Sequence, residues 1–388
     1  MKNKLEIVLF IISFFMIDAT VSYVKKDSLE ENNNIDTEIK AVYISYLEYL
    51  NGNNSQVKID KMIDNINEDH FNTILLHVSP FSDSVYHSKI FPFSHTLTGF
   101  EGKYPGFDFL EYFIKKSHQK NIKVYAWINP YRISFDNSIN ISKDNPAYNL
   151  LNTSSVYVDN KGIYYNPASE IVKNLIIKQV EEIIDNYNVD GIHFDDYFYI
   201  QDDIDKEEYE IFKKNGGTLS LKEFRLNNTN DLIKRVYKVI KEKNSNIIFS
   251  VAPDGNINNN YLYHYADVKT WLSSDEYIDM IMPQIYYGFN NEYSPFIKVL
   301  NNWINLRTNK DIKIVPVLAI YKSGLIDKEA GNGINEWVNN DDLIIRQVNV
   351  IKGYELSGYS LFRYDFMYDK SKMNEKSVKE IENLRKFS

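Results

Sequence analysis

The sequence has no cysteine among its 388 residues. This absence excludes disulfide bonds, thiolate metal sites and a lipid attached through a cysteine. Clustered basic residues are lacking as well, since the formal net charge is −9 and no stripe of Lys and Arg is present. Because the phosphates of nucleic acids bind clustered Lys and Arg, the composition argues against a nucleic-acid partner.

Several enzyme motifs are also missing. No Gly-rich phosphate-binding fingerprint follows the first predicted strand, which argues against a doubly wound sheet, the main alternative fold. There is no H-E-x-x-H and no comparably close ligand spacing. The acidic run over residues 201–208 lacks the glycine and the terminal glutamate of a calcium loop. We therefore expect no metal ion and no other cofactor.

The N-terminal 24 residues have a basic start, a short apolar centre over residues 7–17 and small residues at their end. This order is typical of a secretory signal, and the apolar centre is too short for a comfortable membrane span. The acidic flanks Glu6 and Asp18 leave an uncleaved N-terminal anchor as an alternative. Residues 25–39 are polar and predict a disordered linker. We expect a secreted or cell-surface protein. It would contact a membrane only if the N-terminal 24 residues stay attached as an anchor.

The remaining residues, 40–388, alternate between strand-like and helix-like patterns. Strands are predicted over residues 41–47, 73–78, 123–128, 189–199, 247–251, 277–286, 312–320 and 358–363. Helices are predicted over residues 57–70, 107–120, 168–187, 219–243, 261–273, 294–307, 341–353 and 372–387. Eight strands that are each followed by a helix predict a single α/β domain, a (β/α)8 or TIM barrel with loop insertions.

The stretch over residues 189–199, V-D-G-I-H-F-D-D-Y-F-Y, is the most informative of these strands. It is apolar at its start and acidic at its end. Since side chains alternate along a strand, Ile192 and Phe194 face one side, whereas His193 and Asp195 face the other. Carboxylates at the C-terminal tip of a buried barrel strand are typical of an active site.

The tips of the eight strands meet in one cleft if the barrel forms. The first three tips carry Ser45, Tyr46, Glu48, His77, Ser79, Asp83, Trp127, Asn129 and Arg132. The other five carry His193, Asp195, Asp196, Tyr197, Asp254, Gln284, Tyr286, Tyr287, Tyr321, Arg363, Tyr364 and Asp365. Acidic, aromatic, amide and guanidinium groups together favour a neutral, polyhydroxylated ligand over a phosphate.

Glycoside hydrolysis needs an acid for the leaving oxygen and usually a carboxylate that attacks or activates water. Asp195 is the candidate nucleophile or charge stabiliser, with His193 placed to orient it. Asp254 is the first candidate acid and Asp196 the second. A substrate with an N-acetyl group could itself supply the attacking atom, so that one acid would suffice.

Each assignment has a structural alternative. Asp195 and Asp196 cannot both point inward, so one of them is a loop cap or a partner for Arg132 or Arg225. His193 is equally expected as a hydrogen-bonded residue of the barrel core. Asp254 precedes a glycine and fits a turn. Trp127, Tyr286 and Tyr287 could pack the barrel instead of stacking on a ligand.

Several stretches together resemble the glycosyl hydrolase-like family 10, a group of bacterial barrel proteins. They are Y-H-S-K-I-F-P-F-S with L-T-G and the later Gly102, A-W-I-N-P-Y-R at residues 126–132, D-G-I-H-F-D-D-Y-F-Y at 190–199, F-R-L-N-N at 224–228 and P-Q-I-Y-Y at 283–287. The resemblance spans residue 40 to the end and implies an enzyme of bacterial cell-wall glycan, including strands that have lost their stem peptides. It implies a cleft around Asp195 and Asp196, with Asn129, Arg132, Gln284 and Tyr286 in the same mouth.

Two departures from the family pattern stand out. The chain has A-P-D-G where the family has an S-P-F-G-like stretch, which weakens Asp254 as the acid. It has Tyr287 where a tryptophan is usual, which keeps an aromatic platform.

The sequence therefore predicts a secreted or surface glycosidase that cleaves a β-linked amino-sugar polymer, in particular peptidoglycan glycan. Its catalytic candidates are Asp195, Asp196 and Asp254. Its substrate-binding candidates are His193, Tyr197, Trp127, Asn129, Arg132, Gln284, Tyr286, Tyr287 and Arg363. One alternative is a non-catalytic glycan-binding barrel of the cell or spore surface. Another is a metal-dependent hydrolase that would use His77, His193 and Asp195 as ligands.

Overall fold

The computed structural model describes residues 38–52, 54–136, 141–160, 162–195, 198–200 and 203–386. The predicted signal or anchor, and nearly all of the predicted linker, lie outside these residues. Residues Ile39–Ser388 form one compact unit. Within the described residues, no helix is long and apolar enough to cross a membrane.

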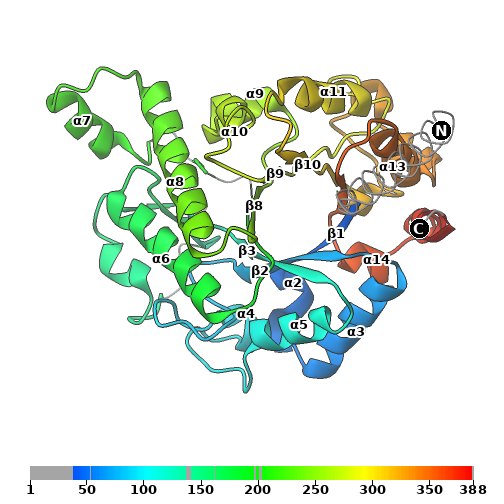
Figure 1. Ribbon diagram of the computed structural model, residues 1–388, viewed down its shortest axis with the longest axis horizontal. Coiled ribbons are helices and arrows are strands. Elements are labelled where there is room, and N and C mark those ends of the chain that lie inside the picture. The colour runs from blue at the N-terminus through cyan, green and yellow to red at the C-terminus, as the bar shows by residue number, and fades with distance from the viewer. Residues whose placement is uncertain are drawn as a thin grey trace, which may run out of the picture. The chain divides into compact units, whose positions relative to one another are not determined.

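The central sheet is parallel, and helices surround it (Figure 1). Its strands are β1 (Ile39–Ile44), β2 (Thr73–Ser79), β3 (Lys123–Ile128), β7 (Gly191–Phe194), β8 (Ile248–Val251), β9 (Met280–Ile281), β10 (Lys313–Ile314), β11 (Val317–Leu318) and β12 (Gly358–Leu361). They follow the order β10-β9-β8-β7-β3-β2-β1-β12-β11. Except for the two end strands, each lies beside its neighbours in chain order, as in a barrel.

The two end strands, β10 and β11, are two halves of one extended segment, residues 313–318. Val315 donates its backbone N–H to Ile281 on the β9 side, at 3.0 Å. The Pro316 carbonyl accepts from Ser360 on the β12 side, at 2.9 Å. The segment therefore bonds to both ends of the sheet and closes it, so eight strands form the predicted (β/α)8 barrel.

Long helices cover the outside of the barrel. They are α3 (Gln56–Glu68), α5 (Phe109–His118), α6 (Glu170–Asn186), α8 (Leu221–Lys243), α11 (Phe296–Leu306), α13 (Leu343–Gly353) and α15 (Glu375–Lys386). Short helices are α2 (Tyr46–Tyr49), α4 (His95–Thr98), α7 (Lys206–Lys214), α9 (Ile257–Asn259), α10 (Val268–Trp271), α12 (Glu336–Asn339) and α14 (Asp365–Tyr368). Side chains of Ser55, Asp108, Ser169 and Ser220 accept backbone N–H groups at the starts of α3, α5, α6 and α8. Such caps fix where a helix begins.

The strands place alternate residues in two cores. In β1, Val42 and Ile44 join the large cluster between sheet and helices, whereas Ala41 and Tyr43 join the cluster inside the barrel. In β7, Ile192 and Phe194 belong to the outer cluster. The predicted alternation along this strand is therefore confirmed.

The sequence missed a small antiparallel sheet after β3. It contains β4 (Arg132–Ser134), β5 (Val156–Asp159) and β6 (Gly162–Tyr165), in the order β4-β6-β5. The polar composition of this stretch predicted only a loop. The expected helix over residues 261–273 is also different, because Tyr265 has a φ of 50° and separates a short π-helical turn from α10.

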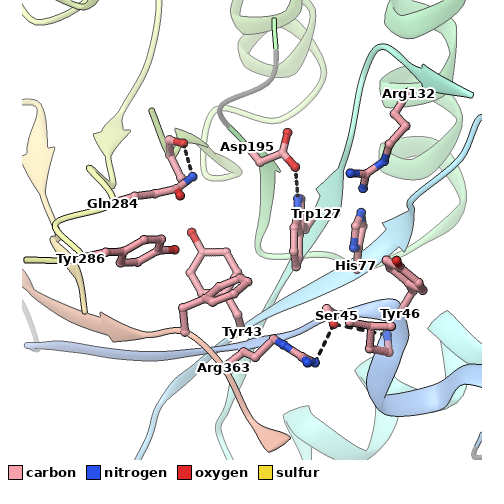
Figure 2. A pocket seen from close by; sticks show the side chains of 13 residues that line it. Tyr43, Ser45, Tyr46, His77, Trp127, Arg132, Asp195, Gln284, Tyr286 and Arg363 are labelled. Atoms are coloured by element: carbon pink, nitrogen blue, oxygen red, sulfur yellow. Dashed lines mark hydrogen bonds between the residues drawn. The ribbon is translucent and has the colours of Figure 1, made fainter. Parts of the chain in front are cut away.

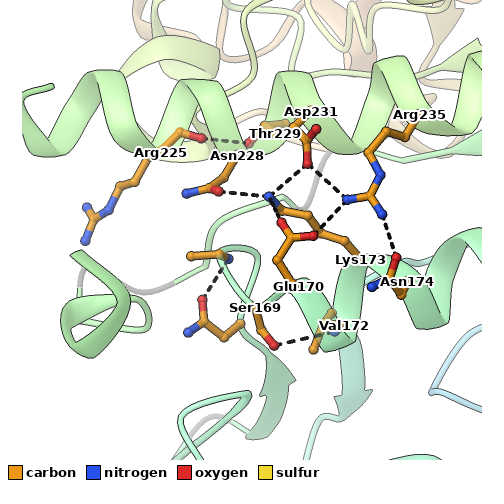
Figure 3. A network of polar contacts seen from close by, with 12 residues as sticks. Ser169, Glu170, Val172, Lys173, Asn174, Arg225, Asn228, Thr229, Asp231 and Arg235 are labelled. Atoms are coloured by element: carbon orange, nitrogen blue, oxygen red, sulfur yellow. Dashed lines mark hydrogen bonds and ion pairs between the residues drawn. The ribbon is translucent and has the colours of Figure 1, made fainter. Parts of the chain in front are cut away.

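A buried lysine joins α6 to α8 (Figure 3). Lys173 is 3% exposed, and its Nζ donates to Glu170 and Asn228 at 2.9 Å and to Asp231 at 3.0 Å. Arg235 reaches both Glu170 and Asp231, so the charges are shared across the interface. A buried ammonium requires such partners, and these therefore fix how the two helices pack.

Glu380 of α15 makes the stability depend on pH. It is 1% exposed and accepts the backbone N–H groups of Leu343 and Ile344 at the start of α13, at 2.6 and 3.1 Å. Burial raises the pKa of Glu380 to about 7. Its protonated form is thus favoured in the folded state, and the stability that it contributes is lost as the pH rises through about 7.

The free energy of unfolding should therefore depend on pH through Glu380. Between pH 5 and pH 8 we expect this free energy, measured by urea unfolding, to fall by about 1–3 kcal/mol more in wild type than in Glu380→Gln. Equal losses in the two proteins would contradict this assignment.

Candidate active site

The mouth of the barrel contains a cavity of about 320 Å³. Its lining comes from the C-terminal ends of seven strands (β1, β2, β3, β7, β8, β9 and β12) and the residues that follow them: Tyr43, Ser45, Tyr46, Leu47, His77, Trp127, Arg132, Asp195, Ala252, Gln284, Tyr286, Phe362 and Arg363. Figure 2 shows Arg132 and His77 on one side, Gln284 and Tyr286 on the other, and Asp195 above Trp127. Six of the predicted site residues therefore meet in one place.

Asp195 follows β7 directly and is 6% exposed. Its Oδ2 accepts from Asn129 Nδ2 at 2.9 Å and from Trp127 Nε1 at 3.3 Å. Both donors come from β3 and its tip, the neighbouring strand in the barrel. Two donors on one oxygen hold the carboxylate in a fixed orientation, as a catalytic carboxylate requires.

His193 lies one layer below the cavity. It is fully buried, and its ring nitrogens bond to the Tyr43 hydroxyl at 2.9 Å and to Ser250 Oγ at 2.8 Å. Burial lowers the pKa of His193 to about 3, so the ring is neutral. It supports the floor of the site, in agreement with the core alternative, and does not line the cavity.

Aromatic rings form much of the floor. Trp127 stacks on His77 with ring centroids 3.7 Å apart and meets the edge of Tyr43 at 5.3 Å. Tyr286 contacts the rings of Tyr321 and Phe362 at 5.7 and 5.9 Å. Flat apolar faces beside polar groups are the surfaces on which sugar rings stack.

Arg363 is held by acidic neighbours. Its Nη1 donates to Glu48, to Ser45 Oγ at 3.0 Å and to Asp365 at 3.4 Å. Burial and the carboxylate of Asp365 raise the pKa of Glu48 to about 7, although Arg363 acts in the opposite direction. Lys372 contacts Asp365 as well. The guanidinium of Arg363 therefore enters the cavity with its charge already paired.

Asp254 follows β8 but does not line the cavity. Its carboxylate accepts from the Asn256 backbone at 2.7 Å and from Asn259 Nδ2 at 3.0 Å, and His264 lies 3.9 Å away. Burial would raise the pKa of Asp254, yet these partners together lower it. The contacts fit the turn alternative, and an acid that stays ionised is poorly suited to donate a proton. Its assignment as the acid stays a prediction.

The remaining predicted residues have different places. Tyr287 packs against the outer core and its carbonyl accepts from Gln347, so it does not line the cavity. Gln284 lines it and donates to the Ala252 carbonyl at 3.0 Å. Asp196 and Tyr197 lie outside the described residues. Arg225 makes a bidentate bond to Asp205, and its predicted pairing with Asp196 stays a prediction because Asp196 lies outside the described residues.

The sequence did not single out Tyr43 and Phe362 for the site. Tyr43 lies inside a strand rather than at its tip, and only its inward position by alternation could have marked it.

Among the described residues, no three His, Asp or Glu side chains gather in a way that could hold a metal ion. The metal-dependent alternative therefore has no ligand set in this part of the chain.

Comparison with known proteins agrees with the geometry. The chain is 28% identical to the glycosyl hydrolase YngK of Bacillus subtilis over 83% of this chain and 68% of that protein. It is 29% identical to the glycosyl hydrolase DigH of Escherichia coli, over 80% and 76% respectively. These matches extend across most of the barrel.

Solved structures share the fold at low sequence identity. The glycoside hydrolase domain of PgaB from Bordetella bronchiseptica has a TM-score of 0.61 at 12% identity, covering 90% of this chain and 98% of that one. The endo-1,4-beta-mannanase of Rhizomucor miehei has a TM-score of 0.56 at 11% identity, covering 90% and 94%. The sequence pattern of the glycosyl hydrolase-like 10 family matches residues 38–332. The predicted glycosidase class is thus confirmed, and the chain belongs to the glycosyl hydrolase-like 10 family.

Proposed function

We propose that this protein hydrolyses the glycan strands of bacterial peptidoglycan, and that it acts outside the cytoplasm. The observation that carries the proposal is Asp195, held by Asn129 and Trp127 at the centre of an aromatic-lined cavity. The signal-like start of the sequence supports export. The names of the relatives YngK and DigH, both glycosyl hydrolases, agree with the reaction class.

Asp195 is the only carboxylate among the described residues that lines the cavity. Two mechanisms accommodate it. In one, Asp195 attacks the sugar and a second acid, from Asp196 or Asp254, protonates the leaving oxygen. In the other, Asp195 is the acid and the substrate's own N-acetyl group attacks, which is open to amino-sugar polymers.

A reducing-end assay tests the proposed function. We expect the purified protein to release reducing ends from peptidoglycan glycan strands, and more slowly or not at all from cellulose, which has no amino sugar. Strands with and without stem peptides are compared in parallel. Release from cellulose alone would reject the amino-sugar specificity and leave the glycosidase.

Glycoside hydrolysis usually needs two carboxyl groups, whereas Asp195 alone lines the cavity among the described residues. This observation also favours one rival function, a barrel that binds glycan without cleaving it. This rival predicts that wild type and Asp195→Asn bind the strands equally and that neither releases reducing ends. Calorimetric binding and the reducing-end assay, run on the same preparation, separate the two functions.

A further inference from the structure

We propose that Arg132 and His77 form a subsite for a carboxylate carried by the glycan. The inference rests on the proposed function and deepens it, because it names a chemical group that the substrate must present beside the cleaved bond. Arg132 begins β4 and His77 belongs to β2, so the two side chains reach the cavity from different elements.

Arg132 is a nearly buried cation without a described carboxylate partner. It is 9% exposed. Its Nε donates to the Pro80 carbonyl at 3.2 Å, and its two terminal nitrogens make no hydrogen bond to any described residue. A guanidinium removed from water is costly unless an anion compensates it. The terminal nitrogens therefore remain available to a ligand in the cavity that they line.

The guanidinium is held in place before any ligand arrives. It lies over the rings of Phe135 and Phe81, with its central carbon 4.2 and 5.1 Å from the ring centroids. Such contacts fix the plane of the guanidinium, and they leave the N–H groups of its two terminal nitrogens able to donate hydrogen bonds. Little side-chain entropy remains to be lost when an anion binds there.

The other arginine of the cavity differs in this respect. Arg363 already donates to Glu48 and Asp365. Its charge is compensated inside the protein, so it offers a hydrogen-bonding surface and little net attraction. The attraction for an anion is therefore concentrated on the side of the cavity where Arg132 lies.

His77 provides the second observation. It is 1% exposed, and within the described residues neither of its ring nitrogens has a hydrogen-bond partner. The ring lies flat on Trp127, with 10° between the planes, and Figure 2 shows the Arg132 guanidinium pointing toward it. Unpartnered buried polar groups are rare, and one that lines a cavity indicates a ligand.

The imidazole is suited to a carboxylate that Arg132 also binds. Burial and the charge of Arg132 hold the pKa of His77 well below its usual range. The ring is therefore neutral and does not repel Arg132, yet it retains one N–H to donate. A planar carboxylate can accept two hydrogen bonds from the guanidinium fork and one more from the imidazole.

On a cell-wall glycan this carboxylate belongs to the lactyl group, which is joined to the amino sugar through an ether bond. The carboxylate is free only where no stem peptide is attached to it. A uronic acid presents the same group from a different position on the ring. The shared chemistry is a sugar carboxylate, and the two sources can be separated by substrate.

The test uses matched muramic-acid oligosaccharides, with the lactyl carboxyl either free or converted to its primary amide. We expect wild type to have a kcat/KM about 10–100-fold higher for the free acid, the range for a charge-assisted hydrogen bond. In Arg132→Gln this ratio should fall to near one. Arg346→Gln is the matched control, since Arg346 is 45% exposed on the outer helix α13, and it should keep the wild-type ratio. A ratio near one in wild type, or an unchanged ratio in Arg132→Gln, would overturn the proposal.

A binding measurement keeps the test informative when turnover is absent. In the Asp195→Asn background, calorimetry should show tighter binding of the free acid than of the amide, and Arg132→Gln should remove the difference. His77→Phe keeps the stack on Trp127 and loses the N–H, so the difference should shrink several-fold. A glucuronate-containing oligosaccharide that shows the same dependence on Arg132 would assign the site to uronic acids. Turnover of neither oligosaccharide, with a preserved binding difference, would reject the hydrolase and retain the subsite.

Discussion

Asp195→Asn is expected to lower kcat on glycan strands by about 10²–10⁴-fold, while the protein still binds them. The amide still accepts the hydrogen bonds of Trp127 and Asn129 on one atom, so the fold of the site is preserved. It can neither attack nor transfer a proton. The measurement is kcat by reducing-end release, together with thermal unfolding to show that the variant is folded.

Rescue experiments on the same variant distinguish the two mechanisms. If Asp195 attacks the sugar, azide should restore turnover of an activated aryl glycoside and yield a glycosyl azide. If Asp195 is the acid, the aryl glycoside, whose leaving group needs no proton, should be cleaved nearly as fast as by wild type. Full activity of Asp195→Asn on natural strands would exclude both roles.

The loss of kcat in Asp195→Asn can be compared with the loss in a second variant, Asp254→Asn. Asp254 bonds within its own turn and does not line the cavity, so a loss of less than about 10-fold in kcat is expected, far below the range for general acid catalysis. A loss equal to that of Asp195→Asn would instead establish Asp254 as the acid.

Arg225→Met is expected to destabilise the protein by about 3–5 kcal/mol. Arg225 and Asp205 are 2% and 0% exposed, and the guanidinium donates to both carboxylate oxygens over 2.8–3.1 Å. Removal of the arginine leaves a buried carboxylate without its cation. Asp205 precedes α7 and Arg225 lies on α8, so the pair joins the segment after β7 to the outer helix. The measurement is urea unfolding of the purified variant.

Two further variants show whether the buried charge is the cause. Arg225→Met combined with Asp205→Asn should regain part of the lost stability, because no unpaired charge remains. Lys234→Met removes an ion pair whose partners are 48% and 56% exposed, and it should cost no more than about 1 kcal/mol. A loss in Arg225→Met as small as in Lys234→Met would contradict the role of the pair.

The order of strands and helices was accessible from the sequence, since the apolar alternation and the repeated strand-then-helix pattern determine a barrel. The position of Asp195 followed from the same alternation, because Ile192 and Phe194 had to face the helices. The Asp254 turn could be recognised only as an alternative, since the decisive contacts with Asn256 and Asn259 depend on local loop geometry. Periodicity carries no information about such contacts.

The insertion after β3 was less accessible. Residues 129–166 are rich in Asn and Ser, and the two short runs V-Y-V-D and G-I-Y-Y, which form the local hairpin β5–β6, were overlooked among them. The pairing of β4 with β6 joins residues far apart in the sequence, such as Arg132 and Tyr164. Gly162, which begins β6 at a φ of 149°, is one of the few residues whose identity locally indicates this sheet. A Cβ there would lie 2.2 Å from the Ser134 carbonyl, which only a glycine tolerates.

This insertion separates two tasks within one active site. Asp195 is carried by a barrel strand, whereas Arg132 is carried by β4, which pairs with β6 outside the barrel. Replacement of the part of the insertion that follows Asn129 and carries Arg132 is therefore expected to alter which glycans are accepted, while Trp127 and Asn129 still hold Asp195. If the proposed subsite is correct, a change in β4 would shift the substrate preference of this barrel while the strand that carries Asp195 stays as it is.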